Sequence, residues 1–196
     1  MCIESIFSTK ICNRDKSICN IYNEFSMNKL KKVVDKIKFS QSTLYVLCGF
    51  PYSGKSYIAK ELVKKTDIMF VSIDDIFHSK GFNWDNNKLP NAEEWKEIFD
   101  ISYIQSQDAL KIGKNVLYDS TNHTKESRNK LREVAYSVNA KSAVIYIQTS
   151  VETVWKRWEE NLNTKDRSVV SKELVQMTID GFEVPDKDEN VLIIEN

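Results

Sequence analysis

The stretch Gly49-Phe-Pro-Tyr-Ser-Gly-Lys55-Ser56 decides how the rest of the chain is interpreted. It follows a short apolar run, Leu44-Tyr-Val-Leu-Cys48, and a helical pattern begins inside it and extends to about residue 65. A strand, a glycine-rich turn and a helix in this order are typical of a loop that cradles the phosphates of a nucleotide. The glycines let the backbone turn so that its N–H groups point at phosphate oxygens, and the helix N-terminus adds a favourable dipole.

The pattern G-x-x-x-x-G-K-S is the complete Walker A motif, or P-loop. It predicts that Lys55 reaches the β- and γ-phosphates of ATP and that the Ser56 hydroxyl holds Mg²⁺. The N-K-x-D signature common in GTPases is absent as a strand-end motif, which leaves ATP as the default nucleotide. The expected nucleotide-binding residues are Gly49, Pro51, Tyr52, Ser53, Gly54, Lys55, Ser56 and Tyr57.

Length and composition indicate one soluble domain with a short appendage. The chain has 196 residues, of which 41% are hydrophobic, and a formal net charge of zero. Polyanion-binding proteins usually carry a basic excess, so any contact with nucleic acid must come from a local patch. No apolar run approaches the length of a membrane span and no signal peptide is recognisable, so we expect a cytoplasmic protein. A reducing compartment argues against a disulfide between Cys12 and Cys19.

The domain is expected to begin near residue 43. Residues 1–42 form an N-terminal extension, in which 27–39 reads as a basic amphipathic helix with Leu30, Val33, Val34 and Ile37 at helical spacing. From residue 43 to 196, apolar runs at 44–48, 68–73, 116–118, 143–147 and 191–194 alternate with helical patterns, one of them announced by a capping box at Asn91 and Glu94. This alternation predicts an α/β fold with a parallel sheet, whose ligands lie beyond the carboxyl ends of the strands.

Two strand ends carry carboxylates. The second strand ends in Ser72-Ile-Asp-Asp75, where one aspartate is expected to cap a short helix and the other to accept the proton of an attacking hydroxyl; we favour Asp74 as that base. The third strand ends in Asp119-Ser-Thr-Asn122, and an acidic residue beside the phosphate loop can hold the Mg²⁺ shell or orient a neighbour. The alternative for Asp119 to Asn122 is a simple turn into the next helix.

Positive charge for phosphoryl transfer is expected from a lid. Arg157 lies on a predicted helix, and Lys165 and Arg167 follow in a polar segment between two helices. A guanidinium stabilises the charge that develops on the transferred phosphoryl group, so Arg157 and Arg167 are predicted catalytic residues with Lys55. The alternative is ordinary solvated surface charge.

Other residues lie on the expected acceptor side. Trp84 can stack on a substrate ring and His78 can contact substrate, although surface or packing roles are the plainer interpretation. The complete set of acceptor-side candidates is Asp75, His78, Trp84, Thr121, Asn122 and Arg128.

Over about residues 43–194 the chain resembles the P-loop kinases of the polynucleotide-kinase type, often described only as AAA-like ATP-binding proteins. The resemblance rests on GFPYSGKS at 49–56, SIDD at 72–75, DSTN at 119–122 followed by Arg128, the series Arg157, Asn161 and Arg167, and the ending 182–189. It implies a five-stranded parallel sheet flanked by helices, with a small helical lid at about 159–172. It also implies transfer of the ATP γ-phosphoryl to a hydroxyl, with Asp74 as general base, Arg157 and Arg167 on the phosphates, and Asp119 beside the acceptor.

Three departures from the family pattern bear on the acceptor and the loop. Phe77 stands where polynucleotide kinases carry an arginine that grips the acceptor's phosphate, Tyr52 stands where the loop usually has glycine, and Asn161 stands nearest the family's lid arginine. A nucleic-acid 5′-hydroxyl is the best-precedented acceptor. A small molecule (an antibiotic, a sugar or a nucleotide sugar) is the alternative acceptor, and an ATP-binding switch without kinase activity is the alternative function. No membrane partner is expected.

Overall fold

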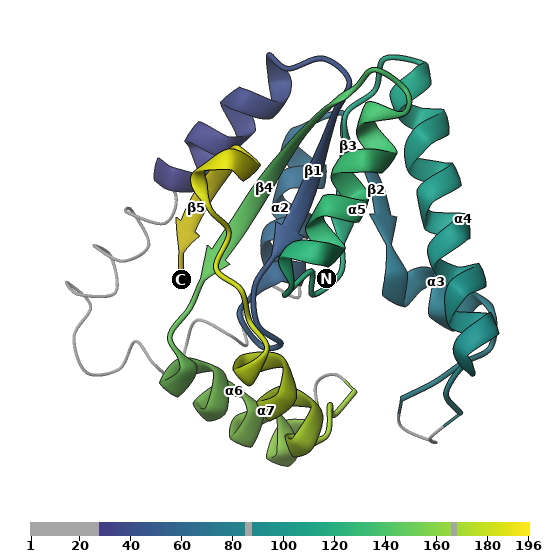
Figure 1. The fold of residues 1–196 in the computed structure, drawn as a ribbon. Coiled ribbons are helices and arrows are strands. Elements are labelled where there is room, and N and C mark those ends of the chain that lie inside the picture. Colours follow the sequence, from purple (N-terminus) through teal and green to yellow (C-terminus); the bar gives the residue numbers. More distant parts are fainter. Residues whose placement is uncertain (1–27, 85–87, 166–167) are drawn as a thin grey trace, which may run out of the picture.

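A computed structural model describes residues 28–84, 88–165 and 168–196. At its centre lies a five-stranded sheet with the strand order β2-β3-β1-β4-β5 (Figure 1). All neighbouring strands run parallel, as the alternation of strands and helices predicts. The strands are β1 (Thr43–Cys48), β2 (Met69–Ser72), β3 (Val116–Asp119), β4 (Lys141–Gln148) and β5 (Val191–Glu195).

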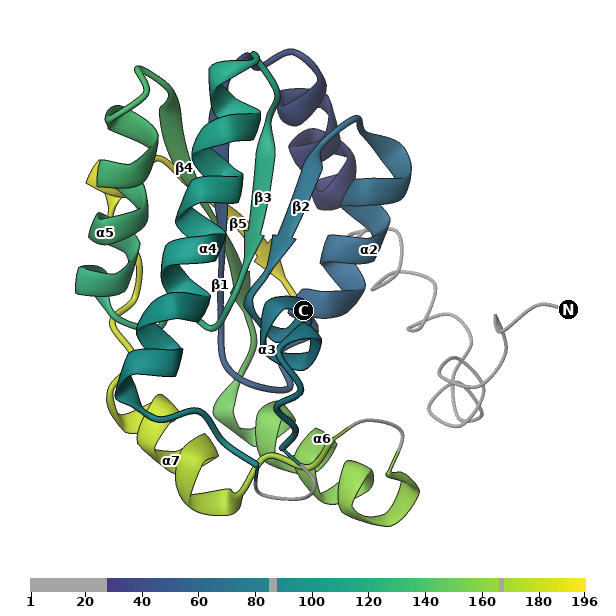
Figure 2. The same ribbon diagram turned by 90° about the vertical axis from the view of Figure 1, so that its right-hand side faces the viewer.

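Helices cover both faces of the sheet (Figures 1 and 2). One face carries α4 (Ala92–Lys111) and α5 (Lys125–Tyr136), and the other carries α2 (Lys55–Lys65) and the helix at 28–38. A parallel sheet needs both faces covered, because its strands are apolar on both sides. Leu44 and Val46 of β1 accordingly belong to one core cluster, and Tyr45 and Leu47 belong to the other.

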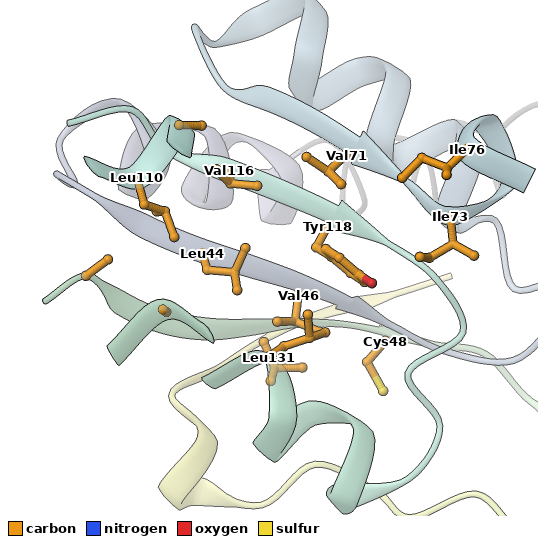
Figure 3. Close-up of a cluster of buried hydrophobic side chains, with 14 of the residues drawn as sticks. Leu44, Val46, Cys48, Val71, Ile73, Ile76, Leu110, Val116, Tyr118 and Leu131 are labelled. Carbon is orange, nitrogen blue, oxygen red and sulfur yellow. The ribbon is translucent and has the colours of Figure 1, made fainter. Parts of the chain in front are cut away.

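Figure 3 shows the core on the α4 and α5 side. Val46 and Val71 are both in register with Tyr118, whose ring lies between strands and helices. The Tyr118 hydroxyl is 2.8 Å from the hydroxyl of Ser102 on α4, so this buried polar group has a partner. The strand residues that precede the functional loops are therefore fixed by close packing.

The amphipathic helix predicted at 27–39 is helical at 28–38, and residue 27 lies outside the described residues. Its apolar positions, predicted from helical spacing, are all buried: Leu30, Val33, Val34 and Ile37. They join the core cluster on the α2 face of the sheet. The helix is thus packed on the domain, with Lys31, Lys32, Lys36 and Lys38 exposed.

A helical lid lies beyond the carboxyl ends of the strands (Figure 1). It contains α6 (Val151–Thr164) and α7 (Lys172–Asp180), and its apolar centre consists of Phe50, Tyr52, Val154 and Val175. After α7, the chain passes through the short 3-10 helix η1 (Lys187–Glu189) into β5. Two members of this cluster come from residues 49–56, so the lid packs directly on the predicted phosphate loop.

The start of α3 (Ile73–Ser79) corrects two expectations. The second strand ends at Ser72 and not at residue 73, and neither Asp74 nor Asp75 caps the helix that follows. The cap is Ser72, whose hydroxyl accepts a hydrogen bond from the Asp75 amide, so both aspartates lie in the first turn. There their negative charges interact favourably with the helix dipole, and both carboxylates remain exposed.

The capping box at Asn91 and Glu94 is confirmed, since each side chain accepts a hydrogen bond from the other residue's amide. Among the described residues, no helix is long and apolar enough to cross a membrane.

Candidate functional site

The loop at 49–56 folds tightly because its glycines allow close backbone approach. A Cβ atom on Gly49 would lie 2.9 Å from the Ile147 carbonyl oxygen and 2.9 Å from the Ser53 Oγ, so no side chain fits there. Gly54 has a φ of 96° and occupies the N-cap position of α2. Both signature glycines are therefore required by the geometry of the turn.

The N-terminus of α2 lacks the side-chain cap that its neighbours have. The helices α3, α4, α5, α6 and α7 are each capped by a serine, threonine or asparagine side chain, whereas Gly54 offers none to α2 and the first turn holds no acidic residue. The Ser53 hydroxyl beside it is buried and has no hydrogen-bond partner within the described part of the chain. A helix N-terminus without a side-chain cap and a buried hydroxyl beside it fit an anion such as a nucleotide phosphate.

Lys55 folds back over this loop. Its Nζ donates hydrogen bonds to the carbonyl oxygens of Gly49 at 2.8 Å and Phe50 at 2.7 Å. The ammonium group thus lies inside the turn formed by the loop, where phosphate oxygens can replace the two carbonyls as its acceptors.

The predicted carboxylates meet at the carboxyl ends of β2 and β3. Ser72 and Asp119 are register partners, and Asp74 follows Ser72 by two residues. Burial raises the pKa of Asp119 to about 6; the nearby Lys55 opposes this, and Asp74 and Asp75 add to it. Four charged side chains from three separate segments therefore share one electrostatic environment at the mouth of the phosphate loop.

The two predicted Mg²⁺ ligands lie on different elements beside the phosphate loop. Ser56 is exposed in the first turn of α2, and Asp119 is half-buried at the end of β3. Within the described ranges no group of three or more histidine, cysteine or acidic side chains has the geometry of a metal site. In nucleotide sites, Mg²⁺ is usually bound by water and phosphate oxygens together with only one or two protein ligands.

Arg157 of α6 contacts the phosphate loop. Its Nη1 donates to the Tyr52 carbonyl oxygen at 3.2 Å, and the guanidinium also lies beside Gly54. Burial lowers the pKa of Arg157. The second predicted lid arginine, Arg167, lies outside the described residues. Tyr57, predicted to bind nucleotide, is 64% exposed on α2.

The loop after β3 is fastened to the start of the phosphate loop. The Thr121 carbonyl accepts a hydrogen bond from the Gly49 amide at 3.4 Å, and the Asn122 side chain donates to the Leu47 carbonyl at 2.7 Å. Asn122 is 6% exposed and has a left-handed φ of 46°. The Asn122 side chain therefore holds two loops together, and its predicted contact with substrate stays a prediction.

The Arg128 side chain, predicted to contact substrate, lies inside the domain. Arg128 is 2% exposed and its Nε and Nη2 form a two-pronged ion pair with Glu189 of η1, at 2.6 and 3.0 Å. Its Nη1 donates to the Asn122 carbonyl at 3.1 Å. Arg128 is thus an internal brace between α5, the loop after β3 and the chain segment that leads into β5.

Two further acceptor-side candidates, Trp84 and His78, lie in or beside an aromatic cluster. Phe77 is fully buried, and its ring stacks on Trp84 at a centroid distance of 4.8 Å and on Trp95 at 5.6 Å. Trp84 is therefore a member of an aromatic cluster, with only part of its surface left for a ligand. His78 stays exposed, and its Nδ1 is 3.2 Å from the Phe82 carbonyl oxygen.

Three residues at this site have no signal in the sequence. Glu189 completes the buried ion pair, while Thr149 and Asn196 both donate to the Ser53 carbonyl oxygen, at 3.1 and 2.6 Å. Each lies far along the chain from its partner, and polar residues of these types are common at strand ends. Only the folded structure brings Thr149 and Asn196 to the phosphate loop and Glu189 to Arg128.

The sheet, the glycine loop with its lysine, and the lid together define a P-loop nucleotide-binding protein with the architecture of a kinase. The chain belongs to the family described as chromatin associated protein KTI12, whose family model matches residues 43–190.

Solved structures with the same fold include proteins of several kinds. Kti12 from Chaetomium thermophilum, in complex with ADP-AlF3, is 18% identical with a TM-score of 0.58, over 78% of this chain and 88% of that one. A kinase of Chloroflexus aurantiacus, assigned as such without proof of activity, is 13% identical with a TM-score of 0.60, over 78% and 87%. A chain of the Pnkp1/Rnl/Hen1 RNA repair complex is 22% identical with a TM-score of 0.61, over 71% of this chain and 43% of that one.

Proposed function

We propose that this protein is an ATP-dependent phosphotransferase that moves the γ-phosphoryl group to a hydroxyl acceptor. The observation that carries the proposal is the convergence of Asp74, Asp75 and Asp119 with Lys55 at the mouth of the phosphate loop. Nucleotide binding alone needs the loop and its lysine. Activation of an acceptor hydroxyl needs, in addition, an exposed carboxylate beside them that can accept a proton.

Each residue has a defined role in this reaction. Asp74 accepts the proton of the acceptor hydroxyl, whose oxygen forms a bond to the γ-phosphorus while the bond to the β-phosphate oxygen breaks and ADP leaves. Lys55 and Arg157 neutralise the phosphate oxygens as charge shifts toward ADP. Ser56 and Asp119 would hold Mg²⁺, which would supply further neutralisation of the phosphate charge.

For the acceptor, we propose a nucleic-acid 5′-hydroxyl as the first compound class to test. The fold similarity to a chain of an RNA repair complex supports it. The buried Phe77 favours the small-molecule alternative, because a phenyl ring at that place cannot grip a phosphate. The two differ in salt dependence: contacts with a phosphate backbone weaken steeply as salt increases, whereas binding of a neutral small acceptor does not.

The experiment uses γ-labelled ATP, Mg²⁺ and 5′-hydroxyl RNA and DNA oligonucleotides. Label transfer by the wild-type protein that Asp74→Asn abolishes would support the proposal, provided that the variant still binds ATP. Nucleotide binding without any transfer to oligonucleotides would exclude the nucleic-acid acceptor and direct the search to sugars, antibiotics and nucleotide sugars.

The second candidate is an ATP-driven switch that phosphorylates nothing. Membership of a family described by its chromatin association, and not by a reaction, favours it. A switch requires Lys55 and tolerates Asp74→Asn in its partner-binding function, whereas a kinase requires both residues.

The expected location is the cytoplasm, and the family's description makes the nucleus the alternative.

A further inference from the structure

Tyr52 occupies a position in the phosphate loop that suits glycine better. Its φ is 63°, in the left-handed region that side chains rarely adopt. It is nevertheless 4% exposed, so its ring is buried and not displayed to solvent. A strained conformation of this kind persists only when surrounding contacts hold it, and such residues cluster at functional sites.

The contacts that hold Tyr52 come from the lid. Its ring packs in the cluster with Val154 of α6 and Val175 of α7. Its hydroxyl accepts a hydrogen bond from the Val170 amide at 3.3 Å. The Val170 carbonyl in turn accepts from the Trp158 indole at 2.8 Å, so the segment that leads into α7 is held from both sides.

The backbone of Tyr52 makes a second connection. Its carbonyl accepts the hydrogen bond from Arg157, the predicted catalytic arginine on α6. Tyr52 lies between Phe50, whose carbonyl accepts from Lys55, and Gly54, which begins α2. Any rearrangement of the loop around a phosphate group must therefore move the residue on which Arg157 and Val170 both depend.

We propose that Tyr52 is a positioning residue that couples occupancy of the phosphate loop to the placement of the lid. Through its carbonyl it sets the position of Arg157, and through its ring and hydroxyl it sets the position of residues 168–171. The proposal rests on the proposed function only in that the loop binds nucleotide. Because coupling between two sites is reciprocal, the lid must also affect nucleotide affinity through this residue.

The test measures hydrogen exchange of backbone amides in 168–175, with and without saturating ADP and Mg²⁺. In the wild-type protein, ADP should slow this exchange. In Tyr52→Gly, which removes the ring and suits the left-handed backbone, an ADP concentration shown to saturate the variant should no longer slow exchange in the lid. Tyr136→Phe, at an exposed tyrosine on α5, is the control and should behave as wild type.

Tyr52→Phe isolates the hydroxyl and serves if the glycine variant does not fold. It removes the acceptor of the Val170 amide and leaves the ring, so exchange at Val170 should become several-fold faster in the ADP complex. A lid response to ADP in Tyr52→Gly equal to that of wild type, or unchanged Val170 exchange in Tyr52→Phe, would overturn the proposal.

These outcomes separate the coupling from the chemistry. A wild-type protein that binds no nucleotide would overturn both the coupling and the proposed function. A protein that binds ADP and shows the coupled lid response, yet phosphorylates no acceptor, would contradict the phosphotransferase and leave the role of Tyr52 supported.

Discussion

Removal of the Arg128 guanidinium should destabilise the domain strongly. The side chains of Arg128 and Glu189 are 1% and 3% exposed, so Arg128→Met leaves a carboxylate buried without its partner. Breaking a buried ion pair in this way costs about 3–5 kcal/mol. At about 2–4 °C per kcal/mol for a domain of this size, the midpoint of thermal unfolding should fall by about 6–20 °C. Differential scanning calorimetry measures this directly.

Two further variants make the test specific. Lys96→Ala breaks an exposed pair with Asp100, whose side chains are 78% and 51% exposed, and should cost less than about 1 kcal/mol. The double variant Arg128→Met with Glu189→Leu removes both charges and should recover much of the loss, because replacing a buried pair with apolar residues is often neutral. A loss for Arg128→Met no larger than that for Lys96→Ala would refute the assignment of Arg128 as an internal brace.

Three other substitutions test the site. Asp119→Asn should raise the unfolding temperature at pH 7.5. Because burial raises the pKa of Asp119 to about 6, the stability present below about pH 4 is lost as pH rises and the carboxylate ionises, by at most about 3 kcal/mol before solvent screening. In thermal scans the gain from Asp119→Asn should therefore vanish toward pH 4. Phe77→Ala should cost about 3–5 kcal/mol in denaturant titrations, and native-like stability would contradict the buried aromatic stack. Lys55→Met should weaken binding of a fluorescent nucleotide at least about tenfold, since it removes charge-assisted hydrogen bonds; unchanged affinity would argue against the phosphate-binding role of the loop.

The sequence predicts the fold well because its signals are local. Each strand appears as a short apolar run, and Asn91 with Glu94 announces α4 through a capping box that spans four residues. The parallel topology then places Asp74 and Asp119 together without further information, because the carboxyl ends of all strands meet at one edge. The start of α3 is predicted wrongly, although Ser72 precedes Asp75 by three residues in the spacing of a cap.

The sequence fails where a residue's role depends on a distant partner. Arg128 resembles a substrate-binding arginine until Glu189, 61 residues later, is seen to pair with it inside the domain. Tyr52 looks like a tolerated departure until Val170, 118 residues later, is found on its hydroxyl. Neither contact has a periodicity or spacing, so no reading of a short window reveals it.

The two aromatic departures from the family pattern have opposite consequences for function. Tyr52 stands where the polynucleotide-kinase loop has glycine, yet Gly54 still begins α2 and Lys55 still folds over the loop, while the Tyr52 hydroxyl contacts the lid. Phe77 replaces an arginine, and its ring is sealed between Trp84 and Trp95 with no exposed surface. The neutral ring of Phe77 cannot bind a phosphate in any rotamer. If the protein phosphorylates an acceptor, recognition must come from other elements, so the polynucleotide-kinase pattern is a sounder guide to the nucleotide side of this site than to the acceptor side.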